Sequence, residues 1–204
     1  MANNTDRRSP LALVLLSLLA EEPMHPYRMR EMIKARGKDK IANVAARNSV
    51  YQTIDRLQRA SLITVRETAQ DERRPERTVY ELTDAGRETL RRWTRTMLST
   101  VAREFPEFPA ALASLMVLPP EDVVEQLTTR AEKLQAEIDE RSAELAAVGD
   151  LPRLFTLDDD YVLTMKRAEL RWVEQVIAQL RSGELTWSEE WIKEVAARME
   201  GSAG

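Results

Sequence analysis

The chain has no cysteine and only one histidine, His25, among its 204 residues. The absence of thiols excludes disulfides, thiolate metal sites and cysteine nucleophiles, and it fits a reducing compartment. A single histidine cannot form a multi-histidine metal site or a histidine-based catalytic triad in one chain. We therefore expect no enzyme, no catalytic residue, no metal and no cofactor, because the groups that catalysis usually needs are missing.

Long apolar runs are scarce as well. The longest is Leu11–Ala20, which is too short to cross a bilayer. Two arginines precede it, as in a signal peptide, but two glutamates follow at once and no small-residue cleavage site comes before them. We expect a cytoplasmic protein with a buried first helix that begins at Pro10, with Ser9 as its N-cap.

Glycine is rare, with 6 residues in the chain, while Ala, Leu, Glu and Arg abound, which favours helix. Charge is divided unevenly. Residues 1–99 contain 19 Lys+Arg and 13 Asp+Glu, a net charge of +6, and residues 100–204 contain 11 and 21, a net charge of −10. The basic half predicts a polyanionic partner, and chance clustering of charge is the alternative.

Hydrophobic periodicity and capping signals give the order of elements. The first hundred residues predict three helices, two short strands around a charged loop, and a fourth helix capped by Thr83 and anchored by Leu90 and Trp93. The expected strands are 63–67 and 77–82, and the loop is 68–76. Further along, the sequence predicts a linker at Phe105–Pro109 and helices at 121–148, 157–182 and 187–200. In domain terms we expect a first domain at 1–100, a linker or short helix at 101–120 and a second, helical domain at 121–204.

The stretch "NSVYQTIDRLQRASLI", residues 48–63, has one apolar stripe and one polar stripe. Three short helices followed by a two-stranded hairpin are the arrangement of a winged helix-turn-helix, in which the exposed face of the third helix reads the DNA major groove. The candidate DNA-binding residues lie around the third helix, in the hairpin and at the start of the second helix: Arg47, Asn48, Ser49, Tyr51, Gln52, Arg56, Arg73, Arg74, Arg77, His25 and Tyr27. The alternative is an ordinary solvated face, with the hairpin arginines paired to neighbouring acids.

Three segments carry a family resemblance: "PLALVLLSLLAEEPMHPYRMREMIKAR", "NSVYQTIDRLQRASLI" and "RTVYELTDAGRETL". Together they resemble the PadR family of bacterial transcriptional regulators over about residues 10–95, an extent set by motif boundaries. The pattern "AELRWVEQVIAQL" resembles the terminal helix of the longer members. The chain departs from the family at Pro26 and Ser61, where glycine is usual.

The resemblance implies a mainly α protein, with a winged helix-turn-helix and a C-terminal antiparallel helical domain that forms a homodimer. The residues expected at the dimer interface are Leu11, Leu15, Leu134, Ile138, Met165, Trp172 and Val176. It also implies double-stranded operator DNA as partner, repression, and a possible small aromatic effector, for which no binding residues are assigned. Two recognition helices would enter successive major grooves about 34 Å apart.

Two alternatives stay open from the sequence. The protein could be a helical adaptor or small-molecule sensor that acts through its acidic second half without DNA, and loss of DNA affinity at high salt would distinguish the two. The four tryptophans, Trp93, Trp172, Trp187 and Trp191, could line an effector pocket, or they could simply pack the core and the interface.

Overall fold

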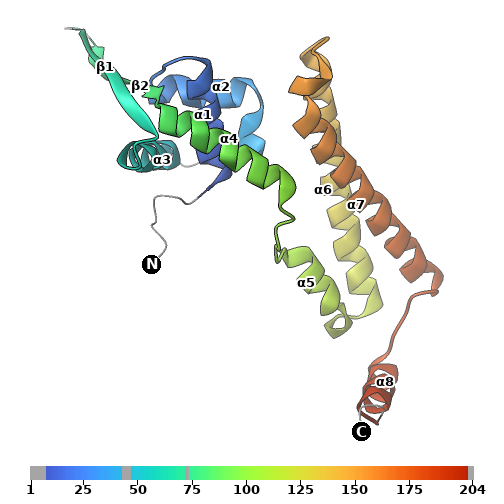
Figure 1. The fold of residues 1–204 in the computed structure, drawn as a ribbon. Helices are drawn as coiled ribbons and strands as arrows, with labels where there is room; N and C mark the ends of the chain where they lie inside the picture. The colour runs from blue at the N-terminus through green and yellow to red at the C-terminus, as the bar shows by residue number, and fades with distance from the viewer. Residues whose placement is uncertain (1–7, 43–46, 72–73, 202–204) are drawn as a thin grey trace. The chain divides into compact units, whose positions relative to one another are not determined.

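The computed structural model describes residues 8–42, 47–71 and 74–201, with the backbone alone at 47–48, 68–71, 74–77 and 199–201. The chain divides into two compact units, Met1–Arg103 and Glu104–Gly204 (Figure 1). Helices dominate, and one two-stranded antiparallel hairpin follows α3, which confirms the predicted fold class. The division falls after Arg103, and the region predicted as a linker or short helix contains two helical segments of the second unit.

α1 (Pro10–Glu21) is the central helix of the first unit. Ser9 caps it as predicted, because its Oγ accepts a hydrogen bond from the Ala12 amide at 3.2 Å. The helix packs against α3, α4 and β2, so it is buried on most sides. Its buried residues are Leu11, Ala12, Leu15, Leu16, Leu18 and Leu19.

α2 (Pro26–Ala35) and α3 (Arg47–Arg59) form the helix-turn-helix. Gly37, with φ of +62°, follows α2, because glycine adopts this left-handed backbone without strain. The connection after it contains a 3-10 turn, η2 (Lys38–Lys40), that the sequence did not predict. The apolar stripe of α3 is confirmed, since Val50, Ile54 and Leu57 are at most 2% exposed.

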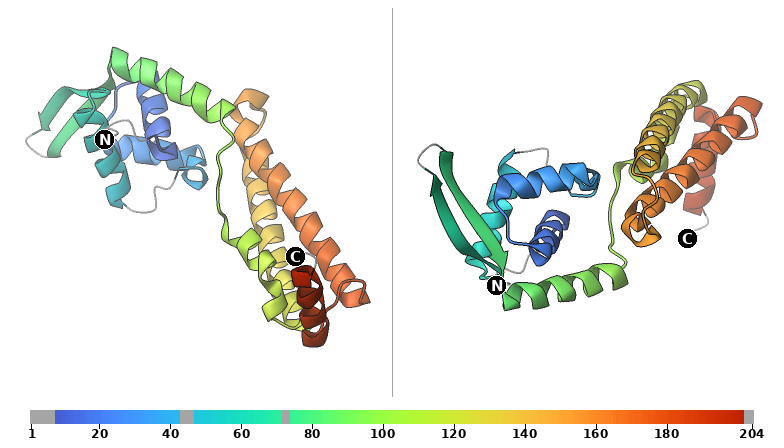
Figure 2. Two further views of the ribbon diagram at one scale, coloured as in Figure 1. Left: turned by 60° about the horizontal axis from the view of Figure 1, so that its bottom comes forward. Right: turned by 90° about the horizontal axis from the view of Figure 1, so that it is seen from above.

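The hairpin pairs β1 (Ile63–Asp71) with β2 (Arg74–Leu82), two long antiparallel strands (Figure 2). Its register runs from Ile63↔Leu82 to Asp71↔Arg74. The predicted nine-residue loop at 68–76 is therefore wrong, because the described backbone pairs through most of it. The hydrophobic pattern did not predict this extension because its residues are polar. Hydrogen bonds between the backbones of paired strands do not depend on buried side chains. The result is a longer wing than the sequence indicated.

Hydrogen bonds to the carbonyl group of Leu62, the residue before β1, link the start of the hairpin to the start of α4 (Asp84–Ser99). The Thr83 amide donates to it at 3.1 Å, and Thr83 Oγ1 lies 2.9 and 3.0 Å from the carbonyl oxygens of Ser61 and Leu62. The same Oγ1 accepts from the Gly86 amide at 3.0 Å and so caps α4 as predicted. A Cβ on Gly86 would lie 2.0 Å from the Leu62 oxygen, which explains the glycine three residues after the threonine. Ser61 has φ of +57°, the left-handed conformation expected at this position.

α5 (Glu107–Ala113) begins the described helices of the second unit, where the sequence predicted a linker at Phe105–Pro109. That prediction is wrong because Pro106 takes the N-cap position and Pro109 lies in the first helical turn. Amides of the first turn have no partner within the helix, so a proline there costs no hydrogen bond. A 3-10 turn, η3 (Leu115–Val117), follows.

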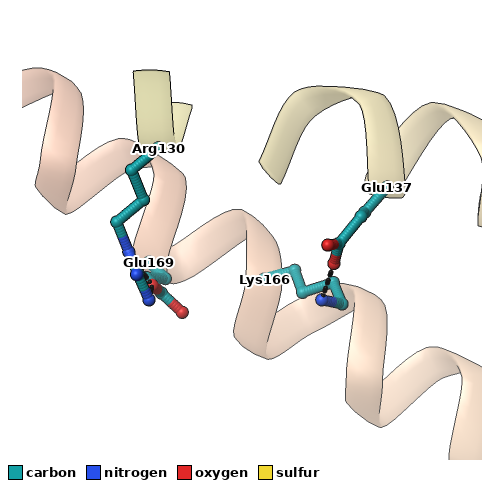
Figure 3. A network of polar contacts seen from close by, with 4 residues as sticks. All are labelled: Arg130, Glu137, Lys166 and Glu169. Carbon is teal, nitrogen blue, oxygen red and sulfur yellow. Dashed lines mark hydrogen bonds and ion pairs between the residues drawn. The ribbon is translucent and has the colours of Figure 1, made fainter. Parts of the chain in front are cut away.

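α6 (Pro120–Ala147) and α7 (Leu157–Ser182) run side by side in opposite directions, joined through the short η4 (Arg153–Phe155). Their shared core contains Val123, Leu127, Leu134, Ile138, Leu163, Leu170, Val173, Val176, Ile177 and Leu180. Ion pairs Arg130–Glu169 and Lys166–Glu137 connect the two helices outside this core (Figure 3). Gly183 ends α7 with φ of +77°, so the helix stops after residue 182 as predicted.

The helix predicted at 121–148 ends one residue earlier than expected, because α6 ends at Ala147 and Val148 is 56% exposed. The aspartates at the start of α7 occupy its first turn and the N-cap is Thr156, so they act on the helix dipole rather than as caps. One of them, Asp159, forms an ion pair with Arg141, a side chain of α6 that is 6% exposed.

α8 (Glu189–Gly201) follows α7, in agreement with the predicted final helix. Trp187 precedes it and donates from Nε1 to the Leu118 carbonyl at 3.1 Å, which fixes the connecting segment to the second unit. Trp191, on α8 itself, is 51% exposed.

Candidate nucleic-acid interface

The exposed side of α3 carries a row of polar side chains, here called the α3 outer face. Its members are Tyr51, Gln52, Asp55, Gln58 and Arg59, all exposed. Their spacing of three and four residues places them together, opposite the apolar stripe that packs into the core. Between them they present amide, phenol and guanidinium donors as well as carboxylate and amide acceptors, which is the chemistry needed at base edges and phosphates.

The first turn of α3 contains three more predicted contacts. Ser49 is half-buried, and its carbonyl accepts from Thr53 Oγ1 at 2.7 Å. The backbones of Arg47 and Asn48 lie in the first turn of the helix, and their side chains are outside the described residues. Their contact with DNA stays a prediction.

Arg56 is not on the α3 outer face, although the sequence predicted an exposed side chain. It is half-buried and donates from a terminal nitrogen to Ser9 Oγ at 3.1 Å. Because Ser9 also caps α1, this bond fixes the recognition helix to the start of the central helix. The two residues are 47 positions apart, so no local sequence signal could have indicated the pairing.

His25 and Tyr27 lie at the start of α2. His25 is the N-cap, and its Nδ1 accepts from the Arg28 amide at 3.1 Å, so this nitrogen carries no proton in the capped state. The Tyr27 ring stacks near that of His25, with centroids 6.2 Å apart, and Tyr27 is 58% exposed. The histidine thus has a structural role that the sequence did not specify, while the tyrosine remains accessible.

Three arginines were predicted to contact DNA from the hairpin. Arg74 and Arg77 belong to β2, opposite Asp71 and Ala69, but their side chains are outside the described residues. Arg73 lies wholly outside them. DNA contact by these three therefore stays a prediction.

Three pKa shifts describe the electrostatics of the first unit. Arg36 donates two hydrogen bonds to the Glu21 carboxylate, at 2.6 and 2.7 Å, which lowers the pKa of Glu21 and raises that of Arg36. Burial raises the pKa of the Tyr80 phenol, and the negative charge of Asp55 adds to the shift. Asp55 on α3 is therefore close enough to β2 for its charge to act there.

The residues predicted at a dimer interface divide into two groups. Leu11, Leu15, Leu134, Ile138 and Val176 are at most 9% exposed within their own units. In contrast, Met165 is 51% exposed and Trp172 is 43% exposed. Both belong to an exposed apolar stripe on α7, Leu157, Tyr161, Met165 and Trp172, here called the α7 stripe.

The second unit also has an open cavity of about 400 Å³ between α5, α6 and α7. It is lined by Pro106, Phe108, Pro109, Leu112, Arg130, Glu169 and Trp172. Phe108 meets Trp172 edge to face at a centroid separation of 6.1 Å, and the Arg130 guanidinium lies 3.6 Å from the Phe108 ring centroid. The sequence did not indicate this site, since its residues come from three separated segments. The four tryptophans do not share one pocket, because Trp93 is buried in the core of the first unit.

No helix in the described part of the chain is long and apolar enough to cross a membrane. Residues 8–42, 47–71 and 74–201 likewise contain no group of three or more acidic or histidine side chains placed to hold a metal ion.

A helix-turn-helix whose second helix presents a polar face, followed by a two-stranded hairpin, defines a winged helix-turn-helix protein. Residues 15–92 match the model of the transcriptional regulator PadR-like family, which confirms the resemblance seen in the sequence. This part of the chain is therefore similar to PadR-like regulators, and the fold is that seen in solved PadR-family structures.

Similar solved structures include Bacillus subtilis PadR in complex with operator DNA, at 20% identity and a TM-score of 0.69, covering 83% of this chain and 98% of that one. The same protein in complex with p-coumaric acid gives 17% identity and a TM-score of 0.70, with coverage of 85% and 99%. The Vibrio cholerae virulence activator AphA gives 24% identity and a TM-score of 0.65, with coverage of 84% and 98%. No curated protein matches the sequence.

Proposed function

We propose that this protein is a sequence-specific DNA-binding transcriptional regulator that acts as a dimeric repressor. The observation that carries the proposal is the α3 outer face, a row of hydrogen-bonding side chains on a helix whose other side is fixed in the core. Residues 1–99, which include this helix, carry a net charge of +6, although the whole chain has a net charge of −4. Of the similar structures, that of Bacillus subtilis PadR contains operator DNA, which supports the same role for this fold here.

The affinity would come from two sources. Arginine and amide contacts to phosphates position the protein and make binding salt-dependent, whereas α3 distinguishes base pairs in the major groove. Two copies of α3 related by a twofold axis would occupy successive grooves about 34 Å apart on a roughly palindromic operator. Occupation of such a site in a promoter would block transcription sterically.

The first test measures binding of the full chain to the promoter fragment upstream of its own gene and to random DNA, by fluorescence anisotropy across a salt series. We expect preference for the promoter fragment, with affinity falling about 10³-fold or more between 50 and 200 mM salt if six or more phosphates are contacted. Tyr51→Ala and Gln52→Ala should weaken promoter binding while circular dichroism stays native. Glu88→Gln, an exposed change on α4, is the matched control. Equal binding to both DNAs would instead favour the hypothesis that the protein is a helical adaptor or small-molecule sensor that acts without DNA.

Dimerisation is proposed through the α7 stripe. Its residues lie within about 80° of one another around the helix axis, on a side away from the buried core. Met165→Lys should shift the mass in light scattering towards the monomer, because it puts a charge into an apolar contact. Glu174→Lys, which lies about 180° around the same helix, should leave the mass unchanged. A monomeric wild-type protein would refute the dimer.

A planar aromatic effector is proposed for the cavity between α5, α6 and α7. Its volume lies in the range of small-molecule sites, and its two aromatic rings and one cation suit a flat ring that bears an acid group. Bacillus subtilis PadR has been crystallised with p-coumaric acid, which makes that compound the first probe. We expect it to quench tryptophan fluorescence in the wild type and less in Trp172→Phe. Equal quenching in both would exclude this cavity.

A further inference from the structure

The α3 outer face contains one feature that simple attraction to DNA does not explain, the carboxylate of Asp55. An acidic side chain on a surface that approaches phosphates lowers non-specific affinity, because like charges repel. Asp55 is exposed, and the described part of the chain contains no ion pair to its carboxylate. The neighbouring Arg59 directs its Nε to the Asp55 backbone carbonyl, at 3.3 Å, and among the described side chains no cation is paired with the carboxylate.

The position of Asp55 along the helix is that of a base-reading residue. Homeodomain recognition helices contact the major groove from positions spaced i, i+3, i+4 and i+7. In this chain the same spacing, counted from Asn48, selects Tyr51, Gln52 and Asp55. Asp55 lies about 10.5 Å along the axis from Asn48, at 1.5 Å per residue, which corresponds to about three base pairs.

The chemistry of the carboxylate restricts what it can bind. An ionised aspartate only accepts hydrogen bonds, and in the major groove the exocyclic amine of cytosine, N4, is the donor that aspartate pairs with. Guanine and thymine present acceptors there and would leave the carboxylate opposed by like partial charge. The carboxylate therefore contributes to specificity in two ways, since it gains a hydrogen bond at cytosine and is repelled by the acceptors of guanine and thymine.

We propose that Asp55 is a specificity-determining residue that accepts a hydrogen bond from a cytosine in each operator half-site and excludes guanine and thymine from that position. The inference rests on the proposed DNA-binding function. The charge of Asp55 adds to the rise in the pKa of Tyr80 on β2, which agrees with a carboxylate that lies near the hairpin. Asp55 was not among the residues that the sequence assigned to DNA binding, because an acidic residue in a basic domain is ordinarily interpreted as part of the solvated surface.

The experiment selects binding sites from a randomised duplex library with the full-length wild type, Asp55→Ala and Asp55→Asn, and then measures affinities for the enriched sequences and for random DNA. We expect a cytosine at one position of each wild-type half-site, and a penalty of about 10-fold or more for replacing it. Asp55→Ala should lose that penalty, keep the penalties at other positions, and bind random DNA as well as or better than the wild type. Asp55→Asn should change the preference at this position from cytosine to adenine, which an amide reads through N6 and N7.

The controls separate the possible failures. Glu88→Gln removes one negative charge from the same unit on α4 and should leave every positional preference unchanged. If Asp55→Ala keeps the cytosine preference, or weakens operator and random DNA equally, the inference is overturned while the proposed function stands. If the wild type enriches no sequence, the proposed function itself fails.

Discussion

Replacing Gly86 with alanine tests the junction that joins the hairpin to α4. Gly86 is a helical residue without positive φ, so helix propensity alone would make alanine more stable by about 1 kcal/mol. The structure predicts the opposite sign, because the new Cβ would lie 2.0 Å from the Leu62 carbonyl oxygen and 2.7 Å from Leu82 Cδ1. The side chain of Leu82 could move, but the carbonyl is backbone and accepts the hydrogen bond of Thr83.

The size of the effect follows from these contacts. To reach an ordinary separation the helix must move by more than an ångström from Leu62, which adds overpacking strain of about 1–3 kcal/mol. The same movement weakens two hydrogen bonds of Thr83, each contributing about 1 kcal/mol. After the gain in propensity is subtracted, we expect Gly86→Ala to lower the free energy of unfolding of the first unit by about 2–4 kcal/mol.

The assay is hydrogen exchange of α1 amides in the full chain, because these report opening of the first unit separately from the second. Ala85→Gly is the matched control. It is exposed on the same turn and should lose about 1 kcal/mol from propensity alone. A Gly86→Ala protein that is as stable as the wild type, or more stable, would refute the close approach of α4 to Leu62.

Three further changes test other parts of the fold. Ser61→Gly should stabilise the first unit by about 1 kcal/mol in urea denaturation, because serine at φ of +57° is strained and glycine is not, whereas a loss of stability would contradict this. Arg141→Ala should destabilise the second unit by about 3–5 kcal/mol, since it leaves Asp159 without its main cation in a buried position, and a loss below about 1 kcal/mol would show that the ion pair is unimportant. Glu21 has a lowered pKa in the folded protein, so its ion pair with Arg36 contributes stability above the unfolded value of 4.5, and that contribution is lost as pH falls through the folded pKa. The pair is exposed and screened, so the acid-side loss in thermal denaturation should be small, and Glu21→Gln should remove it.

Arg56 illustrates how a correct family pattern can hide a residue's physical role. On a helical wheel it lies at the edge of the polar stripe, and both the spacing and the resemblance favoured DNA contact. The structure shows that it binds Ser9, so any effect of Arg56→Ala on operator binding includes a displaced α3 as well as a lost contact. Comparing it with Tyr51→Ala separates the two, because Tyr51 is 49% exposed on the α3 outer face.

The elements that depend on local rules could be read from the sequence. The α3 stripe of Val50, Ile54 and Leu57 was predicted because a helix packed on one side repeats its apolar residues at a fixed period. Caps at Ser9 and Thr83 and the stop at Gly183 follow from orphan backbone groups and left-handed backbone, which few residue types satisfy. The predictions that failed locally, the loop at 68–76 and the linker at Phe105–Pro109, concern segments whose polar or proline-rich composition is compatible with two structures.

By itself the sequence determined the winged-helix order, the apolar faces and the caps, since these follow from the periods of helix and strand and from backbone hydrogen bonding. Its motifs also indicated the similarity to PadR-like regulators over residues 15–92. Only the tertiary structure decided which distant groups meet: Arg56 with Ser9, the Gly86 helix turn with the Leu62 carbonyl, and Phe108 with Arg130 and Trp172. It also decided which members of a polar stripe face solvent. Such contacts join residues that are far apart in the chain, so their geometry arises from packing of whole elements and not from the preferences of any one segment.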